Sequence, residues 1–180
     1  MSGMTWDPAP VVAGVILIIA WGNDLRGDDG AGRYLAVRLQ RCWRQQGLAV
    51  RRLAVPQLVP ELAVEVAAPG VAAVVFVDTH VATAAAPDVR VRALASAETA
   101  AVWGHHLDPR MVLAYAALLR AEPLPPAWLV TVPGWVFAHG RRLSPATRAA
   151  IARFLDDDQG TLTRLTAAVQ RLVVFGTPQL

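Results

Sequence analysis

Two adjacent aspartates, Asp28 and Asp29, stand in a glycine-rich turn shortly after a strongly apolar segment, residues 16–20. The apolar residues predict a buried strand, and the pattern that begins at Gly30 predicts a helix, so the acids lie where a strand passes into a helix. In an open α/β sheet, the carboxyl ends of the strands border the ligand-binding crevice. We therefore expect carboxylates here to face a site, and oxygen-rich sites attract metal ions.

Further potential metal ligands follow later in the chain. Asp78 comes directly after the apolar run 72–77, which predicts a second buried strand that ends at this residue. His105 and His106 lie in the loop before Asp108, which is expected to cap the next helix. If these loops emerge at one edge of the sheet, two carboxylates and an imidazole converge there. Such a set suits a divalent transition metal with coordination positions left open.

The rest of the chain alternates between strand and helix patterns. Strands are expected at 12–20, 48–55, 72–77, 89–94 and 128–132, and helices at 30–47, 60–68, 108–120, 144–155 and 162–174. This order predicts an α/β fold: a three-layer domain with a mainly parallel, twisted sheet of about five strands, flanked by helices on both faces. We expect residues 1–180 to form a single domain, with residues 1–10 as a loose N-terminal extension.

Composition excludes several classes of protein. The chain is 54% hydrophobic and only 17% charged, which excludes a disordered protein. Its 17 basic residues are all arginines and are scattered along the chain, so nucleic-acid binding is not expected. The apolar run 11–21 is shorter than the ~20 residues that cross a bilayer, and we expect no membrane insertion. The single cysteine, Cys42, excludes an internal disulfide and fits a reducing compartment, so we expect a cytoplasmic protein.

Three other chemistries are disfavoured. The glycine-rich turn lacks the Gly-Lys-Ser/Thr ending of a phosphate-binding loop, and its two carboxylates would repel phosphate. Cys42 falls within an expected helix without the nearby base that activates a catalytic thiol. No Gly-X-Ser-X-Gly motif is present for a serine hydrolase.

Four motifs between residues 15 and 143 share a resemblance to one family. They are the signature Gly22-Asn23, Leu25, Gly27-Asp28-Asp29-Gly30 and Gly32, and the segments 57–63, 75–78 and 105–109. In this order they resemble the motifs of the NiFe-hydrogenase maturation proteases. Asp29 replaces the glutamate of many relatives, and Asp24 occupies a position that is commonly apolar or proline in the family.

The resemblance implies an endopeptidase that removes a C-terminal peptide from the nickel-loaded precursor of a NiFe-hydrogenase large subunit. The family's metal site maps onto Asp29, Asp78 and His105. The precursor would supply the nickel, and no permanent organic cofactor is implied. Two carboxylates and one imidazole are few ligands for nickel, so the precursor's own ligands would complete the shell. The metal would then polarise the scissile carbonyl or acidify a bound water, with a carboxylate accepting the proton.

Alternatives remain for individual residues and for the function. Asp28 is expected to cap the helix or brace the loop while Asp29 faces the site. His106 could exchange roles with His105, and His80 is interpreted as a solvated loop histidine rather than a ligand. Two other functions are a non-proteolytic assembly factor, which binds a hydrogenase subunit or metal as a checkpoint, and a metal-dependent hydrolase of a small molecule.

Overall fold

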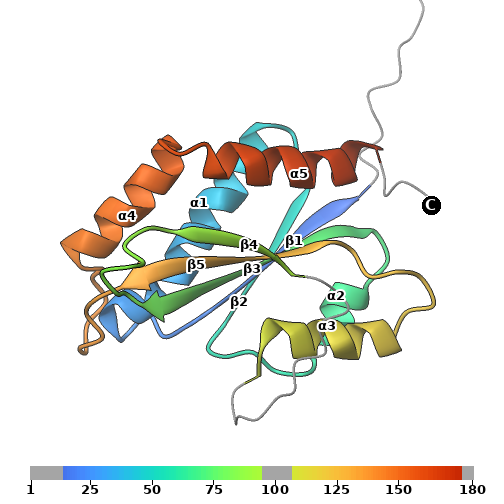
Figure 1. Cartoon of the computed structure of the whole chain (residues 1–180). Helices are drawn as coiled ribbons and strands as arrows, with labels where there is room; N and C mark the ends of the chain where they lie inside the picture. The colour runs from blue at the N-terminus through green and yellow to red at the C-terminus, as the bar shows by residue number, and fades with distance from the viewer. Residues whose placement is uncertain (1–13, 95–106, 176–180) are drawn as a thin grey trace, which may run out of the picture.

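A computed structural model describes residues 14–94 and 107–175, which form a five-stranded sheet with helices on both faces (Figure 1). The strands are β1 (Val15–Trp21), β2 (Val50–Val55), β3 (Val71–Val81), β4 (Arg90–Leu94) and β5 (Ala127–Gly134). The helices are α1 (Ala31–Gln45), α2 (Leu62–Ala67), α3 (Pro109–Leu118), α4 (Pro145–Asp156) and α5 (Thr161–Phe175). The strand order is β2-β1-β3-β5-β4, and only β4 pairs antiparallel. The predicted α/β fold is confirmed.

Two apolar layers hold the helices against the sheet. Because side chains alternate along a strand, Ile16 and Ile18 of β1 pack toward α1, α4 and α5, whereas Leu17 and Ile19 pack toward α2 and α3. Figure 1 shows these two groups of helices on opposite sides of the sheet. Both faces of the central strands are therefore buried, which explains why their sequences are continuous apolar runs instead of alternating patterns.

The structure corrects the expected end of β3. This strand does not stop at Asp78 but continues to Val81, because β5 supplies pairing partners from Thr131 opposite Asp78 to Gly134 opposite Val81. On the other side, pairing with β1 ends one residue before Asp78, at Val77. Asp78 therefore lies inside a strand, at the point where β1 ceases to border it and the carboxyl edge of the sheet opens.

Two helices begin with a side-chain cap, and the one at Asp108 is the cap that the sequence predicts. Asp108 precedes Pro109, and its side chain accepts a hydrogen bond from the backbone N–H of Arg110 at 2.8 Å. Ser144 does the same for Thr147 at the start of α4, at 3.2 Å. The expected extension at residues 1–10, as well as His105 and His106, lie outside the described residues. Within residues 14–94 and 107–175, no helix is long and apolar enough to cross a membrane.

Candidate functional site

A short 3₁₀ turn, Gly27–Gly30, connects β1 to α1 and carries both aspartates. Gly22 and Gly27 have φ values of +128° and +55°, which disfavour any residue with a side chain. A Cβ at Gly22 would collide with the carbonyl oxygen of Asp29, and one at Gly27 would lie 2.6 Å from the carbonyl oxygen of Val136. The glycines thus allow the turn to fold back on β1 and to press against the loop after β5.

Asp28 is completely buried and braces that loop. Four groups donate hydrogen bonds to its carboxylate: the backbone N–H groups of Trp135 (2.9 Å), Val136 (2.8 Å) and Ser144 (2.6 Å), and the Ser144 hydroxyl (2.8 Å). Burial by itself would raise the pKa of Asp28, but these hydrogen bonds outweigh it and the pKa lies below its usual value. Asp28 therefore has the bracing role considered above, and it does not cap α1.

Unlike Asp28, Asp29 has a carboxylate that is not completely buried. Its side chain is only partly buried, and Oδ2 accepts a hydrogen bond from the backbone N–H of Asn23 at 3.0 Å. Among the described residues, no other group donates to this carboxylate. The Oδ2 atom of Asp29 is thus oriented by the Asn23 backbone, and none of the described groups donates to Oδ1.

Asp78 is brought next to the same turn by close packing of α1 on β3. A Cβ at Gly32 would lie 3.0 Å from the Cα of Asp78, so glycine permits this approach. The Thr79 hydroxyl accepts a hydrogen bond from the Gly32 N–H (3.0 Å) and donates one to the carbonyl oxygen of Asp29 (3.4 Å). The backbone around Asp78 is thereby tied to the turn that carries Asp29.

The pKa of Asp78 is shifted by burial and by the charge of Asp29. Burial raises this pKa to about 7, a backbone hydrogen bond from Thr79 opposes the shift, and the charge of Asp29 adds to it. The negative charge of Asp29 thus opposes ionisation of Asp78. A cation placed between them would relieve that repulsion.

A third ligand is not found among the described residues. Within residues 14–94 and 107–175, no three His, Cys, Asp or Glu side chains lie close enough together to hold one ion. His105, the third residue expected in the site, and its neighbour His106 are outside these ranges. The structure therefore brings Asp29 and Asp78 together and leaves the placement of His105 as a prediction.

His80 differs from its interpretation as a solvated loop histidine. It lies in the extended part of β3, and both imidazole nitrogens are buried. Burial lowers the pKa of this imidazole. His80 follows Asp78 by two residues, and residues two apart in a strand share a face, so the two side chains lie on the same face of β3.

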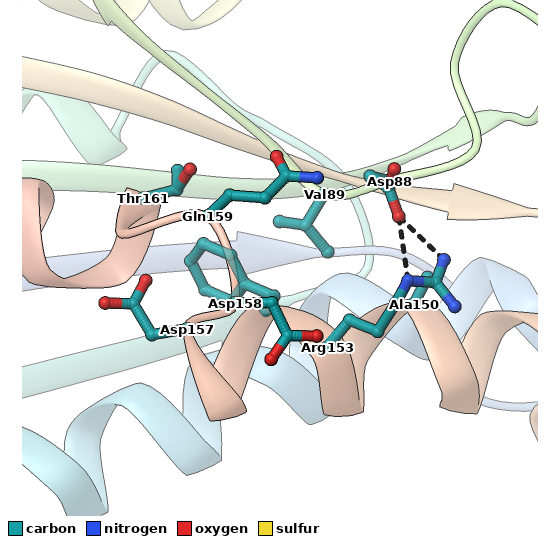
Figure 2. A pocket seen from close by; sticks show the side chains of 9 residues that line it. Asp88, Val89, Ala150, Arg153, Asp157, Asp158, Gln159 and Thr161 are labelled. Atoms are coloured by element: carbon teal, nitrogen blue, oxygen red, sulfur yellow. Dashed lines mark hydrogen bonds and ion pairs between the residues drawn. The ribbon is translucent and has the colours of Figure 1, made fainter.

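A separate small cavity lies between the residues just before β4, α4 and the start of α5, on the face of the sheet that α1 also covers (Figure 2). Its polar side chains stabilise the fold. Arg153 forms an ion pair with Asp88 at 2.6 Å, and the Asp157 carboxylate accepts hydrogen bonds from the N–H groups of Leu162 (2.7 Å) and Thr163 (3.1 Å). This cavity is therefore not a competing candidate for the site.

Comparison with solved structures finds the same fold in hydrogenase maturation enzymes. The hydrogenase maturating endopeptidase HybD from E. coli has a TM-score of 0.57 and 19% identity, covering 87% of this chain and 92% of that one. The NiFe-hydrogenase maturation protease HycI from Thermococcus kodakarensis KOD1 has a TM-score of 0.55 and 18% identity, covering 86% and 92%. The hydrogenase 2 maturation peptidase from Thaumarchaeota archaeon SCGC_AB-539-E09 has a TM-score of 0.51 and 19% identity, covering 78% and 93%.

In sequence, neither a protein-family model nor a curated protein matches the chain. The similarity is therefore carried by structure, and it extends over most of each chain. The glycine turn with its two aspartates and the acidic residue of β3 are the features by which the sequence resembled this family, and here they occupy one edge of the sheet. The chain has the fold of the hydrogenase maturation endopeptidases.

Proposed function

We propose that this protein is an endopeptidase that removes a C-terminal peptide from the nickel-loaded precursor of a NiFe-hydrogenase large subunit. The observation that carries the proposal is the Asp29–Asp78 carboxylate pair at the carboxyl edge of this fold. In such sheets this edge is where ligands bind. Because the free cysteine fits a reducing compartment, we place the reaction in the cytoplasm.

The proposed nickel ligands are Asp29, Asp78 and His105. The first two are tied to one edge of the sheet by the contacts of Gly32 and Thr79. The inclusion of His105 rests on the resemblance of the segment 105–109 to the family's histidine loop.

Two carboxylates and an imidazole match the donors that a divalent transition metal accepts, and they leave positions for ligands from the precursor. Nickel enters as part of the substrate, and when bound it supplies Lewis acidity toward a peptide carbonyl. The protein's own task is to position the ion and to handle protons. In the metal-free protein the pKa of Asp78 is about 7, so binding of the ion would release a proton near neutral pH, and a carboxylate oxygen that does not bind the ion would accept the proton of the reaction.

A protein substrate is favoured by the apolar side chains around the turn. Leu25, Trp135 and Val136 are all more than 40% exposed, and they flank the aspartates on the turn itself and on the loop that Asp28 braces. Exposed apolar groups beside a polar site are typical of surfaces that bind another protein. A hydrolase of small molecules would have no need of this rim.

Nickel binding is expected to weaken as the pH falls through 7. The folded protein holds a proton on Asp78 below this pH, and the ion must displace that proton to bind. Titration of the purified protein with Ni²⁺ between pH 6 and 8 should show affinity that rises with pH and a proton released at pH 6. The same affinity at both pH values would contradict a role for Asp78 as a ligand.

The function is tested by incubating the protein with nickel-loaded and nickel-free precursor. We expect cleavage of the loaded form alone, and we expect Asp29→Asn to lower the rate at least about a hundredfold because a neutral amide replaces an anionic ligand. Asp156→Asn, an exposed aspartate at the end of α4, is the matched control.

The two alternatives give different results in this experiment. If neither precursor is cleaved and Asp29→Asn only weakens the complex, the protein is an assembly factor. Turnover of a small substrate without any precursor would instead indicate a hydrolase of another kind. Equal cleavage of both precursor forms would contradict recognition of nickel.

A further inference from the structure

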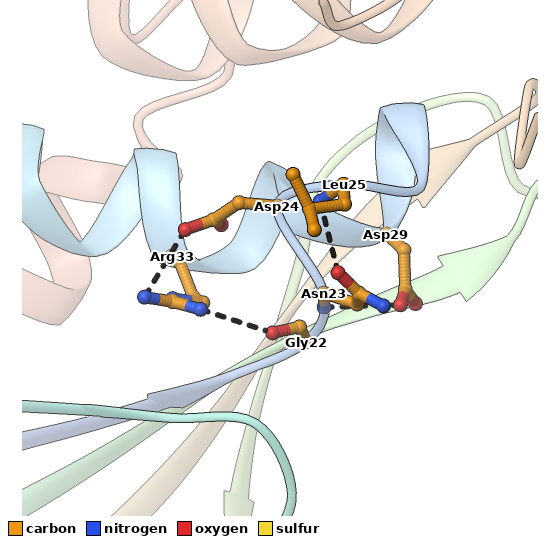
Figure 3. Close-up of polar contacts among 6 residues, drawn as sticks. All are labelled: Gly22, Asn23, Asp24, Leu25, Asp29 and Arg33. Carbon is orange, nitrogen blue, oxygen red and sulfur yellow. Dashed lines mark hydrogen bonds and ion pairs between the residues drawn. The ribbon is translucent and has the colours of Figure 1, made fainter. Parts of the chain in front are cut away.

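One arginine holds the loop that leads into the glycine turn. Figure 3 shows Arg33, on the first turn of α1, reaching back to residues on both sides of Asn23. One terminal nitrogen donates to the carbonyl oxygen of Gly22 at 3.2 Å, and the other forms an ion pair with Asp24 Oδ2 at 3.1 Å. The guanidinium thus contacts the residue before Asn23 and the residue after it.

Asn23 is the residue that contacts the proposed ligand. Its backbone N–H donates to Asp29 Oδ2 at 3.0 Å, and its side-chain oxygen accepts from the N–H of Leu25 at 2.9 Å (Figure 3). The direction of the Asn23 N–H is determined by the backbone on either side, which is the part that Arg33 holds. A chain of contacts therefore leads from Arg33 through the loop to one oxygen of Asp29.

We propose that Arg33 and Asp24 are positioning residues, which hold Asn23 so that its N–H fixes Asp29 with one oxygen directed to the ion. This inference rests on the proposed function of the same site. It assigns a role to Asp24, the residue that departs most from the family pattern. Nickel ligands act only when their donor atoms are correctly oriented, and hydrogen bonds to a ligand commonly provide that orientation.

The chemistry of the guanidinium suits this task. Its planar fork presents separate nitrogens to two acceptors, whereas the single ammonium of a lysine provides one point charge. The Arg33 and Asp24 side chains are 28% and 51% exposed, so their ion pair is expected to add little to overall stability. A small displacement of a catalytic group, in contrast, has a large effect on rate. Loss of the pair should therefore affect the site more than the fold.

The experiment compares Arg33→Ala, Arg33→Lys and Asp24→Asn with Arg38→Ala, an exposed arginine of the same helix. Three quantities are measured for each: amide hydrogen exchange at Asn23, the dissociation constant for Ni²⁺ alone, and kcat and KM for the loaded precursor. In Arg33→Ala we expect about tenfold faster exchange at Asn23, with unchanged exchange in β1, and weaker Ni²⁺ binding. We expect about a tenfold lower kcat with a similar KM.

The other variants should show smaller changes in exchange, Ni²⁺ binding and kcat than Arg33→Ala. Asp24→Asn keeps an oxygen that accepts from Arg33 and should be intermediate, Arg33→Lys should recover only part of the loss, and Arg38→Ala should match the wild type. Unchanged exchange at Asn23 in Arg33→Ala would overturn the proposal. Exchange that accelerates equally throughout β1 would also overturn it, because the role would then be only structural.

Failure of the proposed function gives a different pattern. If the wild type cleaves no precursor but Arg33→Ala still accelerates exchange at Asn23 and weakens Ni²⁺ binding, the positioning role stands and the peptidase proposal falls. If cleavage is normal in Arg33→Ala, the positioning proposal falls and the peptidase remains.

Discussion

Asp78→Asn is expected to abolish precursor cleavage while making the folded protein more stable at pH 8. The two effects have one cause. At pH 8 the folded protein carries an ionised Asp78 that is largely buried and close to Asp29, and both conditions oppose the charge. Asparagine keeps the size of the side chain and removes the charge. It also removes the anionic ligand and the group that accepts a proton.

The sign of the pH dependence follows from the raised pKa. In the unfolded chain the pKa of Asp78 is near its ordinary value of 3.8, and in the folded protein it is about 7. The folded state therefore binds the proton more tightly, and wild-type stability falls as the pH rises from 4 to 7. The difference between these two pKa values corresponds to about 4 kcal/mol of unfolding free energy. Because the buried Asp78 side chain can relax toward water, we expect Asp78→Asn to raise the unfolding free energy at pH 8 by only about 2 kcal/mol.

Urea unfolding of wild type and variant at pH 5 and pH 8 measures this effect. The gain in unfolding free energy should be much larger at pH 8 than at pH 5, and cleavage should be undetectable in a protein that is better folded. Asp156→Asn, which also removes one negative charge, should change neither quantity. A variant that cleaves at the wild-type rate, or a wild type equally stable at both pH values, would contradict this account.

The sequence predicts the fold well because the information is local. Each buried strand is a continuous apolar run, and two of the helices begin at residues whose side chains cap them, Asp108 and Ser144. The meeting of Asp29 and Asp78 could also be expected, since Asp29 follows β1 and Asp78 lies toward the carboxyl end of the neighbouring parallel strand β3.

The features that the sequence could not reveal depend on distant partners. β3 continues through Asp78, Thr79 and His80 because β5, about fifty residues later, supplies hydrogen-bond partners, and no periodicity in β3 itself records this.

The role of Asp28 also depends on distant partners. Its donors are more than a hundred residues away, on the loop after β5 and at the start of α4. From the sequence, capping and bracing by Asp28 could not be separated.

Asp28→Ala is expected to destabilise the protein by about 3–5 kcal/mol. The carboxylate accepts from three backbone N–H groups and one hydroxyl, and its removal leaves these donors without their acceptor in a buried site. Ser144→Ala deletes only one of these donors together with the cap of α4, so a loss of about 1–2 kcal/mol is expected.

Unfolding in urea at pH 7 measures both losses, and repetition at low pH adds a check. Because the pKa of Asp28 is lowered in the folded protein, its contribution is present above about pH 4 and is lost as the pH falls further. The difference between wild type and Asp28→Ala should therefore narrow in acid. A loss no greater than that of Ser144→Ala would contradict the bracing role.

Cleavage by Asp28→Ala should decline by more than the unfolded fraction alone explains. The turn that carries Asp29 is joined to the loop after β5 through this carboxylate and through backbone hydrogen bonds at Gly27 (2.7 Å) and Asp28 (2.8 Å). Without the carboxylate, the turn can shift even in molecules that remain folded, and a shift of about 1 Å is costly for catalysis. Rates measured at low temperature, where the variant is folded, distinguish this effect from simple loss of stability.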